Sequence, residues 1–143
     1  LVGASQFIRK FRPDISFAIG ELSKFLVSPN LDHMDAALYL AGYLRRTAST
    51  KGMVFGGARD YTIRVVSDSD HGNCPDTGRS TSGLGVFVGG SLITHKSKLQ
   101  HITTLSSAEA ELVALVLAIC EAKWVCSMLW ELVRRGPGPV LRY

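Results

Sequence analysis

The stretch that decides the fold is Ser106-Ser107-Ala108-Glu109-Ala110-Glu111-Leu112-Val113-Ala114-Leu115, in which a polar start leads into an apolar run. Ser106 and Glu109 have the S-x-x-E spacing of a capping box, so a helix is expected to begin here. Glu111 follows two residues later, which turns it roughly 200° away from Glu109 about the helix axis. Glu111 therefore takes no part in the cap, and it is either an ordinary solvated acid or the partner of another group.

The helix that begins here is expected to cover about residues 107–134 and to end before the Gly-Pro repeat at 136–139. Its residues are apolar on most sides through Cys120, which predicts a helix packed centrally against a sheet. Residues 140–141 are expected to begin another strand.

Three strands are expected before this helix. Alternating side chains predict a strand from Ile63 to Ser67 that ends at Asp68, and another from Leu84 to Val88. Gly89-Gly90 joins the second strand to Leu92–His95 by a two-residue connection that is typical of hairpins. The pattern therefore predicts an antiparallel three-stranded unit.

Two amphipathic helices are expected in the N-terminal third. The first begins near Pro13, since a first helical turn tolerates proline, and Pro29-Asn30 ends it. The second has Asp32 and Asp35 near its start, where negative charge is favoured, and it ends near Arg45-Arg46. The apolar residues of this helical hairpin recur at helical spacing: Ile15, Ala18, Ile19, Leu22, Phe25 and Leu26, then Ala37, Leu38, Ala41 and Leu44.

The change from helical to extended periodicity sets the expected domain boundary. Glycines bracket a short expected strand at Met53–Phe55, and extended periodicity begins at Tyr61. The boundary is therefore placed at 57–60. The predicted fold class is α/β (α+β), with a helical segment at 1–57 followed by a sheet-containing domain at 60–143.

Composition bounds the class of protein. A chain of 143 residues with 46% hydrophobic content can form a packed core. The net charge of +4 and pI near 9.2 are compatible with a phosphate-backbone partner but do not require one. The chain begins at Leu1, so it is expected to be cut from a longer protein.

Location and membrane contact are inferred from the same composition. The longest apolar run, Leu112–Cys120, is shorter than the roughly 20 residues of a membrane span, and no secretory signal opens the chain, so no membrane partner is expected. Three widely spaced cysteines, Cys74, Cys120 and Cys126, favour reduced thiols. An intracellular location is therefore expected, without a distinction between cytoplasm and nucleus.

Six short motifs follow one another along nearly the whole chain. They are Arg12-Pro13-Asp14-Ile15-Ser16-Phe17-Ala18, Leu31-Asp32-His33, Ser67-Asp68-Ser69-Asp70, Arg79-Ser80-Thr81-Ser82-Gly83, Lys96-Ser97-Lys98 and Leu105-Ser106-Ser107-Ala108-Glu109-Ala110-Glu111. In this order they resemble the C-terminal part of copia-type LTR retrotransposon Pol polyproteins. The resemblance implies that 1–57 is the connection after the reverse transcriptase palm and that 60–143 is an incomplete ribonuclease H-like fold.

The resemblance implies a chemistry for the acidic residues. Ribonuclease H domains hold two divalent ions, Mg²⁺ or Mn²⁺, and cut the RNA strand of an RNA–DNA hybrid, and hard oxygen ligands suit such ions. By this resemblance Asp68 matches the first metal ligand and Glu111 the second, with Asp70 as a candidate auxiliary ligand. The implied partners are the hybrid and the rest of Pol, with the palm upstream and further ribonuclease H elements downstream.

Basic and polar residues near this site are candidates for nucleic-acid contact. Lys96 and Lys98 alternate on a strand and could face a phosphate, although strand lysines also protect sheet edges. Arg79 and Ser80 offer hydrogen-bond donors, although a polar turn between strands explains them as well. The chain departs from the family at two positions where tryptophan is usual, His71 and His95.

The family's third metal-binding aspartate would follow Tyr143, where this sequence stops. We therefore expect weak or absent metal binding and little cleavage by this chain alone. The downstream strand would lie beside Ile63–Val66, so its absence leaves an open sheet edge. Three interpretations remain: part of an active Pol polyprotein, which is favoured, a non-catalytic nucleic-acid-binding remnant, or a protein-interaction module from a decayed or recruited element.

Overall fold

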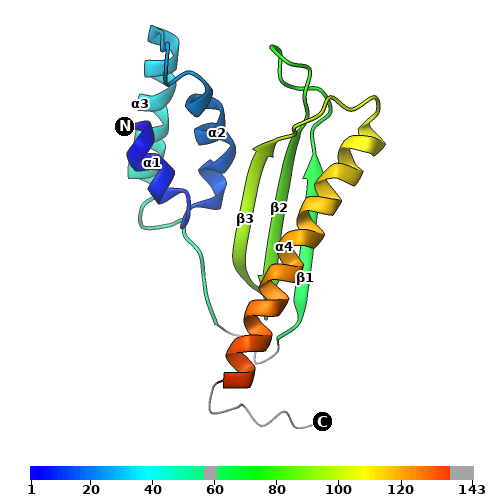
Figure 1. Ribbon diagram of the computed structural model, residues 1–143. Helices are drawn as coiled ribbons and strands as arrows, with labels where there is room; N and C mark the ends of the chain where they lie inside the picture. The colour runs from blue at the N-terminus through cyan, green and yellow to red at the C-terminus, as the bar shows by residue number, and fades with distance from the viewer. Residues whose placement is uncertain (57–60, 136–143) are drawn as a thin grey trace.

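The computed structural model describes residues 1–56 and 61–135, which form a group of short helices, a three-stranded sheet and one long helix (Figure 1). The expected boundary at 57–60 and the expected strand at 140–141 lie outside the described residues. The elements in chain order are α1 (Val2–Ile8), a 3-10 turn (Pro13–Ile15), α2 (Ser16–Lys24), α3 (Leu31–Arg46), β1 (Ile63–Ser69), β2 (Thr81–Val88), β3 (Ser91–Leu99) and α4 (Ser107–Arg135).

Helices α2 and α3 form the expected hairpin around a small apolar core of Ile15, Ile19 and Leu40. Asn30 caps α3, since its Oδ1 accepts from the backbone N–H of His33 at 2.9 Å. The ring Nδ1 of His33 accepts in return from the backbone N–H of Asn30 at 3.1 Å. This reciprocal cap fixes where α3 begins, directly after the Pro-Asn break in the sequence.

Some details of the N-terminal part differ from the sequence pattern. Leu26 and Leu38 are each 56% exposed, so the apolar stripes predicted for the two helices are wrong at these positions. The expected strand at Met53–Phe55 is also wrong, because this segment has no regular structure and Val54 is 82% exposed. A short strand without a neighbour has no partner for its backbone groups, and apolar residues alone do not supply one.

The sheet is antiparallel in the order β1-β2-β3, as the hairpin signal predicts. Gly89 and Gly90 have φ of 54° and 80°, a left-handed conformation that glycine adopts without strain in the tight turn between β2 and β3. Val86 lies at the centre, opposite Val65 of β1 and Thr94 of β3, and is fully buried. Strand β1 forms one edge of the sheet, and its outer side bears on the site described below.

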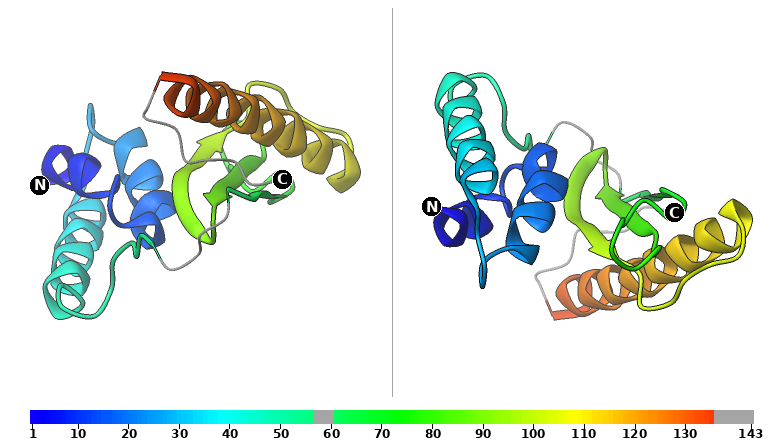
Figure 2. Two further views of the ribbon diagram at one scale, coloured as in Figure 1. Left: turned by 90° about the horizontal axis from the view of Figure 1, so that it is seen from below. Right: turned by 90° about the horizontal axis from the view of Figure 1, so that it is seen from above.

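Helix α4 lies along one face of the sheet, over β1 and β2 (Figures 1 and 2). The residues that face the strands are mostly small and fully buried, which lets the helix approach closely: Ala110, Ala114, Ala118 and Val125. The remaining sides keep large apolar side chains at the surface, including Leu112, Leu115, Val116, Ile119, Trp124 and Trp130. The prediction of a centrally packed helix is therefore wrong in one respect, since α4 is covered on one face only.

The apolar composition of α4 raises the question of whether this helix could span a membrane. The segment Ser107–Arg134 is long and apolar enough to cross a membrane by length and composition alone. A helix that packs on a sheet passes the same test, so this is weak support for a membrane span.

The N-terminal helices contact the sheet through α2, which lies against β3 (Figure 2). Ser16 is buried at the start of α2, and its Oγ lies 3.2 Å from Nδ1 of His95. Burial lowers the pKa of His95 by disfavouring the charged imidazolium. His95 thus forms part of the contact between the helical group and the sheet.

Candidate functional site

Glu111 lies at the outer edge of β1. Its Oε1 accepts from the backbone N–H of Ser69 at 3.4 Å. The bonds of Thr62 and Asp70 show that even-numbered residues direct their backbone groups toward β2. Ser69 is odd-numbered, so its N–H points away from β2. The carboxylate of Glu111 therefore reaches the backbone one residue after Asp68.

Asp68 is exposed and lies on the other face of the sheet from α4. It lines a groove of about 370 Å³ between the sheet and α2, together with Phe17, Phe87 and His95. Side chains alternate along a strand, so Asp68 shares this face with Arg64 and Val66. Asp68 and Glu111 thus approach the end of β1 from opposite faces of the sheet.

Asp70 extends the pairing of β1 with β2. Its backbone N–H donates to the carbonyl of Thr81 at 3.2 Å, and its carboxylate accepts from the N–H of Thr81. The side chain therefore replaces a backbone acceptor at the end of the ladder. One carboxylate oxygen is committed to this structural contact.

The start of α4 carries the two sequence features of a helix cap. Ser106 Oγ accepts from the N–H of Glu109 at 3.2 Å, and the Glu109 carboxylate accepts from the N–H of Leu105 at 2.7 Å. Glu109 thus binds backbone at the N-terminus, whereas Glu111 turns toward β1. The two glutamates have different partners, in line with their angular separation on the helix.

Gln100 joins the end of β3 to the first turn of α4. It is 3% exposed, and its Nε2 donates to Ser82 Oγ at 2.9 Å and to the carbonyl of Ala110 at 3.0 Å. Gln100 was not predicted to support the site, because a glutamine between a strand and a loop carries no distinctive signal. Its contacts hold the residue directly before Glu111 against the sheet.

The polar residues expected to bind nucleic acid have different surroundings. Ser80 is fully buried, accepts from the N–H of Gly72 at 3.0 Å and lies 3.1 Å from Thr104 Oγ1, so it is a structural residue with no surface donor. Arg79 is half-buried, and its carbonyl accepts from the N–H of Cys74 at 3.1 Å. His71 has its Nδ1 3.4 Å from Thr104 Oγ1.

Lys96 and Lys98 lie beside α4 at the other edge of the sheet. Lys96 forms an ion pair with Glu121, and both lysines line a small hollow against Leu117. Lys98 has no ion-pair partner among the residues that the structure describes. Lys98 is therefore the more available of the two for a phosphate.

The donor set has the right chemistry for a hard cation but few members. Asp68 and Glu111 offer carboxylate oxygens, the ligands that Mg²⁺ prefers. Within 1–56 and 61–135, no cluster of three or more His, Cys, Asp or Glu residues is arranged to hold a metal. These acids therefore do not complete a two-metal site within the described residues.

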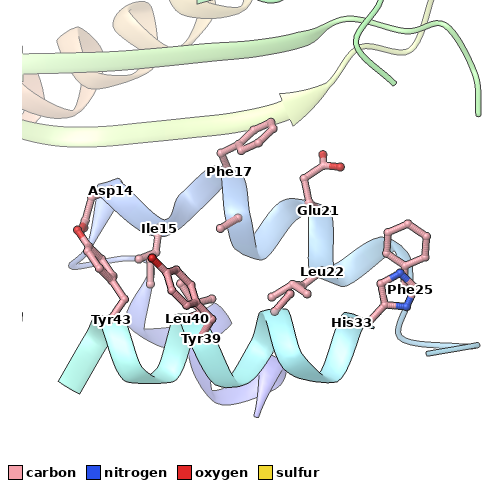
Figure 3. Close-up of a pocket in the computed structure, with 12 residues that line it drawn as sticks. Asp14, Ile15, Phe17, Glu21, Leu22, Phe25, His33, Tyr39, Leu40 and Tyr43 are labelled. Atoms are coloured by element: carbon pink, nitrogen blue, oxygen red, sulfur yellow. The ribbon is translucent and has the colours of Figure 1, made fainter. Parts of the chain in front are cut away.

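A separate apolar groove of about 540 Å³ lies between α2 and α3, lined by Phe17, Leu22 and Tyr39 among others (Figure 3). At one end, Asp14 accepts from Arg12 at 2.9 and 2.8 Å, and from Tyr43 Oη at 2.8 Å. The hydrogen bonds from Arg12 lower the pKa of Asp14 to about 2. This carboxylate is thus held in an ion pair with Arg12 within the helical group, and it also lines the groove that Asp68 lines.

Comparisons with known proteins identify several relatives of this chain by sequence similarity. It matches no family model and no solved structure. It is 33% identical over all 143 residues to the retrovirus-related Pol polyprotein from transposon RE1 of Arabidopsis thaliana, and 35% identical over 121 residues to that from transposon TNT 1-94 of Nicotiana tabacum. It covers 10% and 9% of these two proteins, so it spans about a tenth of their length.

A shorter relative has a different description. The chain is 35% identical over 125 residues to the secreted RxLR effector protein 161 of Plasmopara viticola, a match that covers 87% of each protein. The matches to several transposon proteins extend over most or all of the chain and agree with the order of its six motifs. The chain belongs to the protein family that includes the Pol polyproteins of copia-type retrotransposons.

Proposed function

We propose that this chain is the ribonuclease H-like region of a copia-type Pol polyprotein, preceded by the connection that follows the reverse transcriptase palm. Its role is metal-dependent cleavage of the RNA strand of RNA–DNA hybrids during reverse transcription, carried out by the longer polyprotein. The observation that supports this best is the contact of Glu111 with the backbone of Ser69, which brings an α4 carboxylate to the strand end that carries Asp68.

In this proposal Asp68 and Glu111 hold Mg²⁺ or Mn²⁺, with Asp70 as an auxiliary ligand. A bound divalent ion supplies activation of water and stabilisation of the leaving oxygen. Glu111 is kept in place by the packing of α4 and by Gln100, which binds the carbonyl of Ala110. Asp68 offers its oxygens from the groove face of β1. Two carboxylates alone predict weak metal binding by this chain.

Nucleic-acid contact is assigned to exposed cations beside the sheet. Lys98 is the first candidate, and Lys96 would have to give up its ion pair with Glu121. Contacts of lysine with phosphates position a duplex without reading its sequence. The expected partner is therefore the backbone of a hybrid.

Cleavage of a labelled RNA–DNA hybrid by the polyprotein that contains this region tests the proposal. Asp68→Asn and Glu111→Gln should each reduce Mg²⁺-dependent cleavage about 100-fold or more, since even residues that only orient metal ligands contribute 10- to 100-fold. Glu109→Gln serves as the matched control, because Glu109 binds backbone at the helix start. Unchanged cleavage in both ligand variants would refute the assignment.

A second candidate function is a non-catalytic interaction module. The match that covers 87% of a secreted effector of similar length favours it, because that relative has this region without a Pol polyprotein around it. Binding of a hybrid to the isolated chain separates the two classes. A nucleic-acid module should bind with an affinity that falls as salt rises, since phosphate contacts release counterions. Undetectable binding at low salt would leave the protein-interaction class.

A further inference from the structure

A small hollow lies where the N-terminal helices meet the edge strand β3. It measures about 170 Å³, and the residues that line it come from the end of α1, the start of α2 and one stretch of β3: Arg9, Ser16, His95, Lys96, Ser97 and Lys98. None of these lining residues is acidic. One water takes up about 30 Å³ in the liquid, so the hollow has room for a small polyatomic ion.

Strand β3 offers unpaired hydrogen-bond donors at this hollow. The N–H of Gln100 donates to the carbonyl of Ser80 at 2.8 Å, which shows that even-numbered residues at this end of β3 direct their backbone groups toward β2. Ser97 is odd-numbered, so its N–H points outward. Among the residues that the structure describes, neither this N–H nor the Ser97 hydroxyl has a hydrogen-bond partner.

Two cations without a counter-ion line the same hollow. Arg9 is half-buried, and within 1–56 and 61–135 its guanidinium forms no ion pair and no hydrogen bond. Lys98 is exposed and has no ion pair in this part of the chain either, whereas Lys96 is bound to Glu121. A partly buried charge without a partner is unfavourable, so the hollow favours an anion.

The positive charge of Arg9 acts inside the hollow. Burial above all, and then the charge of Arg9, lower the pKa of His95, against an opposite effect of hydrogen bonding to the backbone of Lys10 and Arg9. His95 Nδ1 lies 3.2 Å from Ser16 Oγ, so this ring is held by the helical group. The imidazole is therefore a neutral wall of the hollow at neutral pH, and the positive charge there comes from Arg9 and Lys98.

We propose that this hollow binds one phosphate group, held by the guanidinium of Arg9, the N–H and hydroxyl of Ser97 and the ammonium of Lys98. A guanidinium matches two phosphate oxygens with two parallel hydrogen bonds. The donors come from α1 on one side and from β3 on the other, which suits the four oxygens of a tetrahedral oxyanion better than the two of a carboxylate. The bound group joins the helical group to the sheet.

The phosphate group has two chemical sources. Four residues line both this hollow and the groove that contains Asp68, so the two adjoin: Ser16, His95, Lys96 and Ser97. A nucleic-acid strand in the groove would place a backbone phosphate in the hollow, and this source rests on the proposed function. A free phosphate ion needs only the hollow itself.

Titration of the 143-residue chain with inorganic phosphate tests the site, followed by amide signals in NMR spectra at constant ionic strength. The Ser97 amide signal should shift and saturate with a dissociation constant of about 1 mM. Arg9→Gln should raise this constant about tenfold or more, and Lys98→Gln about threefold. Lys10→Gln is the matched control, because it removes the same charge from a side chain that lies over the Phe7 ring, 5.4 Å from its centre. It should leave the constant unchanged.

The outcomes separate the site from its source. A Ser97 shift that does not saturate, or an equal loss of affinity in Arg9→Gln and Lys10→Gln, overturns the site. Arg9→Lys keeps the charge without the guanidinium fork, so this variant, folded by circular dichroism, should bind with intermediate affinity. A short RNA–DNA hybrid should compete with phosphate and raise its apparent dissociation constant. Phosphate binding without competition supports the site with a free ion as its ligand and contradicts the nucleic-acid source alone.

Discussion

Glu111 Oε1 accepts from the backbone N–H of Ser69 at 3.4 Å, so a helix acid and the strand that carries Asp68 meet at one sheet edge. This contact separates Glu111 from its neighbour Glu109, which binds the N–H of Leu105 at the helix start. The two glutamates give a matched pair of substitutions with opposite expected results.

Paramagnetic Mn²⁺ should report the difference between the two glutamates. In the isolated chain, added Mn²⁺ is expected to broaden the backbone amide signals of Ser69 and Leu112 in NMR spectra, because a bound ion at Asp68 and Glu111 lies beside both. Glu111→Gln should remove most of this broadening, since a neutral amide is a poorer ligand than a carboxylate. Glu109→Gln should retain it. Loss of broadening in both variants to the same degree would argue against a specific site.

Gln100 should stabilise the start of α4. Gln100→Leu removes the side-chain amide that donates to Ser82 Oγ and to the carbonyl of Ala110. Both of these acceptors belong to buried residues. The free energy of unfolding should fall by about 1–3 kcal/mol, the cost of leaving buried polar groups without a partner. Urea denaturation followed by circular dichroism measures it. Gln6→Leu, which loses a half-buried contact with Ser23, should cost less, and a larger effect there would contradict the assignment.

Larger side chains should destabilise the fold where α4 packs closely on the sheet. Ala114 is fully buried, so Ala114→Leu is expected to lower the free energy of unfolding by about 1–3 kcal/mol through overpacking. Ser107 is exposed at the start of the same helix, so a larger side chain would meet no such restriction there. Leu115, which follows Ala114 in the chain, is 44% exposed. Thermal unfolding of Ala114→Leu and Leu115→Ala compares the two faces. A greater loss for Leu115→Ala would mean that the outer face is the covered one.

Asp14 should make stability depend on acid. Its pKa is lowered to about 2 by hydrogen bonds from Arg12, below the usual value near 3.8. A lowered folded-state pKa stabilises the fold above the unfolded value, and that stabilisation is lost as pH falls from about 4 toward about 2. The contribution is expected to be about 1 kcal/mol, since the carboxylate is partly exposed.

The variant Asp14→Asn isolates this contribution. Its unfolding free energy should be lower than that of the original chain at neutral pH, and the difference should shrink between pH 4 and pH 2 as the native carboxylate takes up a proton. Urea titrations at several pH values measure this difference. A difference that stays constant over that range would show that the ion pair with Arg12 is not its cause.

The strands and the long helix were predictable because their signals are local. Alternating residues mark β1 and β2, a Gly-Gly pair marks the turn into β3, and Ser106 with Glu109 marks the start of α4. The short helix α1 and the irregular segment at Met53–Phe55 were not predicted correctly. Short segments depend on contacts with the rest of the fold more than on their own pattern.

The candidate site was predictable only in part. The motif resemblance singled out Asp68 and Glu111, but residue spacing carried no information about the faces of the sheet from which they approach. Ser80 looked like a surface donor among polar neighbours, yet it is fully buried between Gly72 and Thr104. Gln100 gave no signal because its role comes from contacts with a strand and a helix distant from it in the chain.

By itself the sequence determined the three strands, the hairpin of α2 and α3 and the start of α4, and which family the motifs resemble, because periodicity, turn residues and caps act over a few neighbouring residues. Only the tertiary structure decided that α4 is covered on one face and that Glu111 meets the outer edge of β1. It also decided that Arg64, Val66 and Asp68 share the face of β1 opposite α4. These relationships depend on strand order and on helix placement, which join residues that are far apart in the chain.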